Sequence, residues 1–284
     1  MPTRFSKLFC LITAFLFFSQ VLIAQASFYP SDTIWRRTVH RILDLESPRN
    51  KALRHFPDSL KSNYRSLIQV IIDGVETYGV DAYSEVEGTQ FVGLMTLNEM
   101  YDNMGGKVDT IWVDDVDNED APQTMEIIHE GGGLDAVVRY EIIEEYYFVK
   151  STSRFSRSII GIKPIVAFVK DDPTDNEAEE PVDSEENLTF KEVAWFRFDQ
   201  LKDLLEVAQM KNPANQNSFS NYLTKFESGD FDSYIIELNN NFGVGIADYT
   251  DAQQNPNEPT LQMILESRRI EYELFNFEMN LWEY

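Results

Sequence analysis

The sequence offers very little from which a thiol or metal site could be built. It contains one cysteine, Cys10, and three histidines among 284 residues. Cys10 lies in an apolar N-terminal segment that we expect to be removed, so the mature chain would hold no cysteine. Disulfides, thiol catalysis and cysteine-ligated metals are thereby excluded from the mature protein. His40, His55 and His129 are dispersed and form no HExxH motif, which argues against a zinc site.

The common catalytic and cofactor motifs are also missing. No G-x-S-x-G nucleophile elbow occurs, and the triple glycine at 131–133 is not followed by the Lys-Ser/Thr pair of a phosphate loop. The run from Asp115 to Glu119 has some of the oxygen spacing of a calcium loop but no glycine at the sixth position. We therefore expect no catalytic residue, no cofactor and no metal.

A pair of carboxylates leaves one enzymatic alternative open. Glu144 and Glu145 are followed by three aromatic residues, which could stack on a sugar, and a glycosidase needs only two suitably spaced acids. Neighbouring residues of a strand point to opposite faces, however, and the same aromatics are explained by sheet packing. A secreted, glycosidase-like enzyme remains the alternative to a binding or structural role.

Long hydrophobic runs are absent except at the N-terminus. Arg4 and Lys7 precede an apolar stretch from Leu8 to Ala24, and a small-residue cleavage site follows at Ala24-Gln25-Ala26. This pattern predicts a secretory signal peptide over residues 1–26. We expect the mature protein to start near Ser27 and to be exported from the cytoplasm.

Positive charge is scarce. The chain has 24 basic and 48 acidic residues, a net charge of −24, which makes nucleic acid and acidic lipid improbable partners. The charge is uneven, since basic residues crowd positions 36–54 and acidic residues dominate 114–120 and 171–186. Such opposed regions suit head-to-tail assembly, or they are simply solvated surface. We predict that residues 171–186 form a disordered acidic loop, because this stretch has almost no large apolar side chain.

The mature chain is long enough for one sizeable core, and we predict a single domain over residues 27–284. Apolar spacing predicts a helix from Ser59 to Tyr78, and Ser31-Asp32 suggests the cap of a short first helix that would carry Ile34 and Trp35. Two extended runs, 135–150 and 156–168, predict a hairpin at the centre of a mixed, largely antiparallel sheet. Strands and helices mix without regular alternation, which indicates an α+β fold.

The last two dozen residues predict a long amphipathic helix. Ile270, Leu274, Phe277 and Leu281 recur at helical spacing, and a second stripe holds Phe275, Met279 and Trp282. Charged residues occupy the remaining positions, so the segment is not a membrane span. This helix could close its own domain or bind a neighbouring subunit.

The closing residues LESRRIEYELFNFEMNLWEY resemble the corresponding segment of the GldN/PorN family. The similarity recurs in three other segments, in the same order along the chain: IWRRTVHRILDLES, EEYYFVKSTSRFSRSIIGIKPIV and VAWFRFDQLKDLLEVAQMKNPANQNSFSNYL. The acidic stretch and the run Asn239-Asn240-Asn241 do not match the family pattern. A divergent family member is therefore one possibility, and an adaptor of another trans-envelope complex is a second.

The resemblance implies a non-enzymatic structural component of the type IX secretion and gliding machinery of Bacteroidota. Members of this family form a periplasmic ring with an outer-membrane lipoprotein of the GldK/PorK type and contact a motor subunit of the GldM/PorM type. The chain would then associate with itself in the ring and, through the lipoprotein, with the outer membrane. Buried aromatic and arginine anchors are typical of such interfaces. We expect these residues to lie in or beside subunit interfaces: Trp35, Arg36, Arg41, Phe275, Phe277, Leu281 and Trp282.

Overall fold

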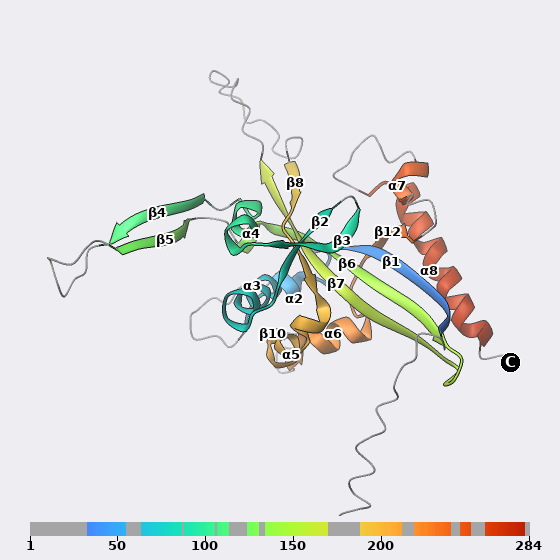
Figure 1. Ribbon diagram of the computed structural model, residues 1–284. Coiled ribbons are helices and arrows are strands. Elements are labelled where there is room, and N and C mark those ends of the chain that lie inside the picture. Colours follow the sequence, from blue (N-terminus) through green and yellow to red (C-terminus); the bar gives the residue numbers. More distant parts are fainter. Residues whose placement is uncertain are drawn as a thin grey trace, which may run out of the picture.

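The fold is built around one long antiparallel hairpin, formed by β6 (Val137–Val149) and β7 (Arg154–Val169) (Figure 1). The computed structural model describes residues 33–54, 64–86, 88–105, 107–113, 124–130, 134–169, 188–211, 219–239, 245–250 and 259–281. The hairpin confirms the prediction from the two extended runs. Its strands are rich in branched and aromatic side chains, which favour a pleated, buried surface.

The other strands extend this hairpin on both sides into a single sheet with the order β12-β1-β6-β7-β9-β2-β3, in which every described pairing is antiparallel. These strands are β1 (Thr33–Asp44), β2 (Ala82–Val86), β3 (Thr89–Met95), β9 (Trp195–Arg197) and β12 (Tyr234–Leu238). A further strand, β8 (Leu188–Glu192), pairs with β7 next to β9. Two short pairs stand apart from this sheet: β4 (Lys107–Val113) with β5 (Thr124–Glu130), and β10 (Gln209–Lys211) with β11 (Phe219–Asn221).

The predicted first helix is wrong, because Ile34 and Trp35 belong to β1. This strand pairs with β6 along almost its whole length and with β12 on its other side. Two β-sheet ladders satisfy many more backbone groups than a single capped turn would, so pairing overrides the local capping signal.

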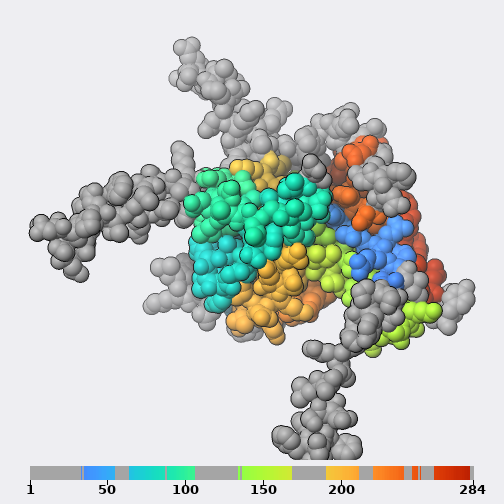
Figure 2. Space-filling view, in the orientation of Figure 1, coloured from blue at the N-terminus to red at the C-terminus, as the bar shows by residue number. Residues whose placement is uncertain are grey.

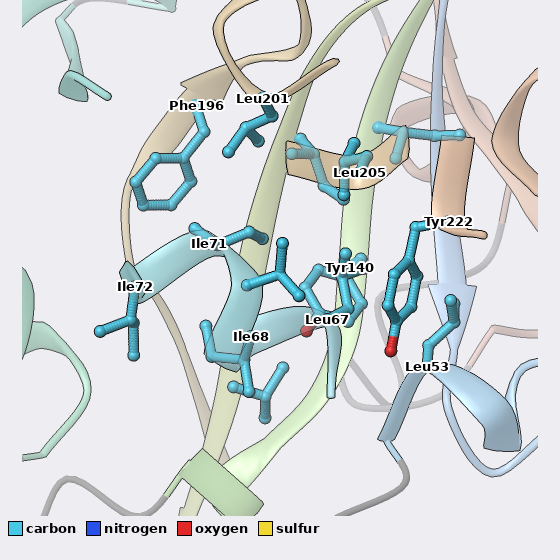
Figure 3. Close-up of a cluster of buried hydrophobic side chains, with 14 of the residues drawn as sticks. Leu53, Leu67, Ile68, Ile71, Ile72, Tyr140, Phe196, Leu201, Leu205 and Tyr222 are labelled. Atoms are coloured by element: carbon cyan, nitrogen blue, oxygen red, sulfur yellow. The ribbon is translucent and has the colours of Figure 1, made fainter. Parts of the chain in front are cut away.

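Helices α3 (Leu67–Tyr78), α5 (Phe198–Val207) and α6 (Tyr222–Ser228) cover one half of a sheet face and form the first core (Figure 3). The predicted helix over 59–78 begins only at Leu67, because Ser66 and Gln69 form a capping box there. Tyr140 of β6 and Tyr222 of α6 are fully buried between these helices and the sheet. Figure 2 shows the turquoise surface of α3 beside the gold surface of α5, so distant segments of the chain share this core.

Two shorter helices, α2 (Lys51–Arg54) and α4 (Leu97–Asn103), border the first core. The start of α4 is fixed by a capping box in which Thr96 and Glu99 cap each other. Near this edge of the sheet, the ring of Phe91 lies directly over Gly161, where a side chain would collide with it. Phe91 has a φ of 60°, a left-handed conformation that is costly for a bulky residue and shows how tightly β3 is held there.

The C-terminal residues form α8 (Leu261–Leu281), as the sequence predicts. This helix, with the short α7 (Ile246–Tyr249), packs beside β12 and β1 (Figure 1). It closes a second core, which consists of Val39, Ile235, Ile246, Met263, Ile270 and Leu274. The antiparallel sheet and the helices on it confirm the α+β class.

Several sequence predictions concern residues outside the described part of the chain. These are the signal peptide at 1–26, the acidic loop at 171–186, His55, the triple glycine at 131–133 and the calcium-like run at 115–119. Among the described helices, none combines the length and apolarity needed to cross a bilayer.

Candidate subunit interface

An aromatic cluster joins the two ends of the chain. Trp35 of β1 stacks on Phe277 of α8 with ring centroids 4.4 Å apart and an angle of 22° between the planes. Phe155 of β7 lies 5.7 Å from Trp35 and 5.9 Å from Phe277, and Tyr146 lies 5.9 Å from Phe155. Ring pairs at these separations stabilise one another beyond the area they bury. The structure therefore brings together two interface candidates that are far apart in sequence.

The other candidates differ in accessibility. Arg36 is exposed and pairs with Glu145 at 3.2 Å, and Phe275 is 55% exposed on the outer face of α8. Leu281 is half-buried at the end of the same helix, and Trp282 lies outside the described residues. Arg36, Phe275 and Leu281 are thus open to a partner, and their role at an interface stays a prediction.

Arg41 is buried and uses its guanidinium within the chain. Its Nε donates to Glu144 at 2.7 Å, its Nη1 to Glu271 of α8 at 2.6 Å, and its Nη2 to the Tyr146 hydroxyl at 3.1 Å. Glu144 is fully buried and also accepts a hydrogen bond from Arg157 at 3.1 Å. These five side chains, which we call the Arg41 network, tie β1, β6, β7 and α8 together.

The position of the Arg41 network explains why it can be buried. Val39, Arg41 and Leu43 alternate along β1 and so share one face of the sheet. Val39 belongs to the second core and Leu43 to the first, which places Arg41 at the boundary between them. Burial opposes the charge of Arg41, but the carboxylates of Glu144 and Glu271 raise its pKa above its ordinary value. Pairing with two carboxylates offsets much of the free-energy cost of burying the Arg41 charge.

A cavity of about 780 Å³ opens beside this network, between the start of β12 and α8. Polar groups dominate its wall, including Arg41, Arg157, Ser233, Ser267, Arg268 and Glu271. The arginines of the network already bond to carboxylates or backbone carbonyls, so the wall is balanced in charge rather than strongly basic.

A second buried set of charges lies at alternate positions, on the opposite face of the sheet. The Nδ1 atom of His40 lies 2.9 Å from Glu141, and Lys163 contacts Glu141 at 2.7 Å and Glu192 at 2.8 Å. Burial disfavours the charged form of Glu141, but hydrogen bonding to His40 and the charge of Lys163 hold its pKa below the ordinary value. Lys163 also lies 4.6 Å from the ring of the buried Trp195. The side chains of this group are thus already engaged with one another.

Neither buried set was predicted from the sequence. A charged residue beside apolar residues in the middle of a predicted strand is the signal that could have revealed them. Arg41, Glu141 and Lys163 each occupy such a position. Glu144 and Glu145 do point to opposite faces, since they pair with Arg41 and Arg36 respectively. Within the described residues, no group of three or more histidine, cysteine, aspartate or glutamate side chains could hold a metal ion.

Comparison with known proteins identifies the family. The family model described as gliding motility associated protein GldN matches residues 29–283, which is nearly the whole chain. No curated protein matches the chain. The chain therefore belongs to the GldN family. Members of this family are components of the gliding motility and type IX secretion machinery, and the family is not a known enzyme family.

Proposed function

We propose that this member of the GldN family is a non-enzymatic, structural subunit of a periplasmic ring in the type IX secretion and gliding machinery. The ring would also contain an outer-membrane lipoprotein of the GldK/PorK type, and it would contact the periplasmic part of a GldM/PorM-type motor subunit. Residues 1–26 would direct export, and residues 27–284 would form one domain held at the outer membrane by the lipoprotein. The observation that carries this proposal is the family match over residues 29–283.

The described structure supports an architectural role through its internal bracing. Two separate cores are linked by the Arg41 network, and the aromatic cluster locks α8 to β1 and β7. A subunit that transmits load needs such connections between its elements. Arg36 follows Trp35 in β1, on the opposite face of the sheet, and the half-buried Leu281 lies one turn beyond Phe277 on α8, so this end of the molecule is the proposed contact region.

The test is an affinity purification of the tagged mature protein from native envelopes, followed by mass spectrometry and particle sizing. We expect a megadalton particle that contains an outer-membrane lipoprotein. Recovery of a clean monomer without partners would overturn the ring proposal and favour the enzyme or adaptor alternatives.

A matched pair of charge reversals tests the contact region. Arg36→Glu should reduce recovery of the lipoprotein, whereas Lys202→Glu on α5 should not. Both residues are exposed and each forms one ion pair, Arg36 with Glu145 and Lys202 with Glu227 at 3.4 Å. Equal recovery with both variants would remove Arg36 from the interface.

A further inference from the structure

The outer face of α8 carries an exposed apolar stripe. Leu261, Leu265, Tyr272, Phe275 and Met279 are 71%, 58%, 65%, 55% and 50% exposed. The opposite face of the same helix is buried in the second core through Met263, Ile270 and Leu274. Packing against the rest of the chain therefore explains why one face of α8 is apolar, but it does not explain the apolar residues of the exposed face. We call the exposed set, together with Arg268, the outer stripe.

The spacing of the outer stripe shows what kind of element it fits. Its six positions, 261, 265, 268, 272, 275 and 279, follow one another by four and three residues in strict alternation. A 3.5-residue repeat keeps one seam facing a second helix along the whole length of the pair, as in a coiled coil. Trp282 continues the same spacing in the sequence, although it lies outside the described residues. The stripe thus matches a helix rather than a strand or a flat surface.

We propose that the outer stripe packs against the outer stripe of a second copy of this chain, with the two α8 helices antiparallel. An antiparallel pair centred at residue 270 places Leu261 opposite Met279, and Leu265 opposite Phe275. Both pairings match apolar with apolar, so the seam is complementary to itself. Self-complementarity is what a two-fold interface between identical copies requires.

Arg268 determines the direction of the pair. In a parallel pair, Arg268 would face Arg268 of the other copy, and two like charges would meet inside the seam. In the antiparallel pair it faces Tyr272 of the other copy, where a guanidinium over an aromatic ring is favourable. Beside the stripe, Arg269 is bonded to both Glu266 and Glu273 of the same helix, so its charge is engaged within the chain.

The size of the seam agrees with a weak but specific dimer. The described helix of 21 residues is roughly 31 Å long at about 1.5 Å per residue. Five side chains that are each half exposed or more offer on the order of 500 Å² of apolar surface per copy. With the flanking residues, the pair would bury roughly 1,200 Å² in total, the lower end for a specific interface.

This pairing goes beyond the ring proposal and does not depend on it. A two-fold contact joins copies in pairs, whereas a closed ring needs a head-to-tail contact through a different surface. Failure to recover the lipoprotein from envelopes would therefore argue against the ring proposal alone. The oligomeric state of the purified chain in solution tests the α8 pair.

Disulfide trapping tests the direction and register. In a Cys10→Ser background the chain has no other cysteine, so each introduced thiol reports on one position. In the antiparallel pair, a thiol introduced at position 265 of one copy adjoins a thiol introduced at position 275 of the other. Two thiols that are both at position 265 lie roughly 15 Å apart along the axis. That separation is too great for a disulfide.

On mild oxidation, we expect an equimolar mixture of Leu265→Cys and Phe275→Cys chains to yield at least fivefold more covalent dimer than either variant alone. Efficient cross-linking of each variant with itself would show a parallel pair and overturn the proposal. Absence of dimer in all three samples would overturn it as well.

A second measurement covers the case in which the cysteine variants disturb packing. Sedimentation of the unmodified mature chain should show a concentration-dependent dimer, and Tyr272→Glu should weaken dimerisation at least tenfold without changing the circular dichroism spectrum. Asn280→Glu, on an exposed flank of the same helix, is the matched control and should still dimerise. A monomer at all concentrations in the unmodified chain would contradict the proposal.

Discussion

At the residue scale, the buried charges explain how distant strands are held in register. The guanidinium of Arg41 contacts Glu144 of β6, 103 positions later in the sequence, and Glu271 of α8, 230 positions later. A buried pair of this kind adds little net stability compared with apolar packing, but removing one partner leaves the other charge without compensation. The Arg41 network therefore makes the native arrangement specific.

We predict that Arg41→Met destabilises the protein by about 3–5 kcal/mol, because Glu144 would remain buried with one arginine fewer. The control is Arg36→Met, which removes an ion pair whose arginine is 57% exposed and should cost less than about 1 kcal/mol. Urea unfolding of both variants measures the difference. Equal stability of the two variants would mean that Glu144 is fully compensated by Arg157.

Glu141 gives the protein a predicted sensitivity to acid. Its pKa in the folded state is lowered by His40 and Lys163, so the protonated form is disfavoured by folding. A carboxyl of this kind contributes stability above its unfolded pKa of about 4.3, and that contribution is lost as the pH falls through the folded pKa. We expect the free energy of unfolding to fall more steeply below about pH 4.3 in the unmodified chain than in Glu141→Gln.

The measurement is urea unfolding at a series of pH values from neutral to acidic. Glu206→Gln, an exposed change on α5, serves as the control and should keep the slope of the unmodified chain. If Glu141→Gln kept that slope as well, the acid sensitivity would have to arise elsewhere in the chain.

At the element scale, α8 protects the edge of the sheet. The backbone N–H of Ile235 in β12 donates to the Ser267 hydroxyl of α8 at 2.7 Å, and Ser267 is buried. An uncovered edge strand would present unpaired backbone groups to other chains. The helix thus completes the second core and also occupies a hydrogen-bonding position of the edge strand.

Ser267→Ala should destabilise the protein by about 1–2 kcal/mol, because the buried N–H of Ile235 would lose its partner. Hydrogen exchange at the Ile235 amide should accelerate more than exchange in β6. Asn280→Ala, a change at an exposed position of the same helix, should leave both quantities unchanged. Unaltered exchange at Ile235 in Ser267→Ala would show that another group, such as water, replaces the hydroxyl.

The elements that the sequence predicts well are those whose signal is local. The periodicity of 261–281 and the run of branched residues in β6 and β7 each lie within one continuous stretch. The first helix was predicted wrongly because the strand that contains Trp35 is stabilised by pairing with β6, which follows about a hundred residues later. The Arg41 network and the stacking of Trp35 on Phe277 also depend on such long-range contacts, and a single sequence carries no direct record of them.

At the scale of the whole molecule, the fold consists of two cores on one face of a shared sheet. The first core is formed mainly by residues from the middle of the chain, and the second joins β1 at its beginning with α8 at its end. The sheet and the Arg41 network connect them, so the C-terminal helix is part of the fold as well as a carrier of exposed surface. Its two faces separate these roles, since one is buried and the other is open.

Removal of residues 261–284 should therefore damage the fold itself. The truncation would expose Val39 and Ile235, delete three buried apolar side chains of the second core, and take Glu271 away from Arg41. Since loss of one large core side chain typically costs about 2–5 kcal/mol, the combined loss should exceed about 5 kcal/mol, comparable to the whole stability of many domains. Thermal unfolding and dye binding to exposed apolar surface would measure the damage. Asn280→Glu, on an exposed flank of the same helix and outside the stripe, should leave both unchanged. A truncated chain that unfolded as cooperatively and at the same temperature as the full one would show that α8 serves only its partners.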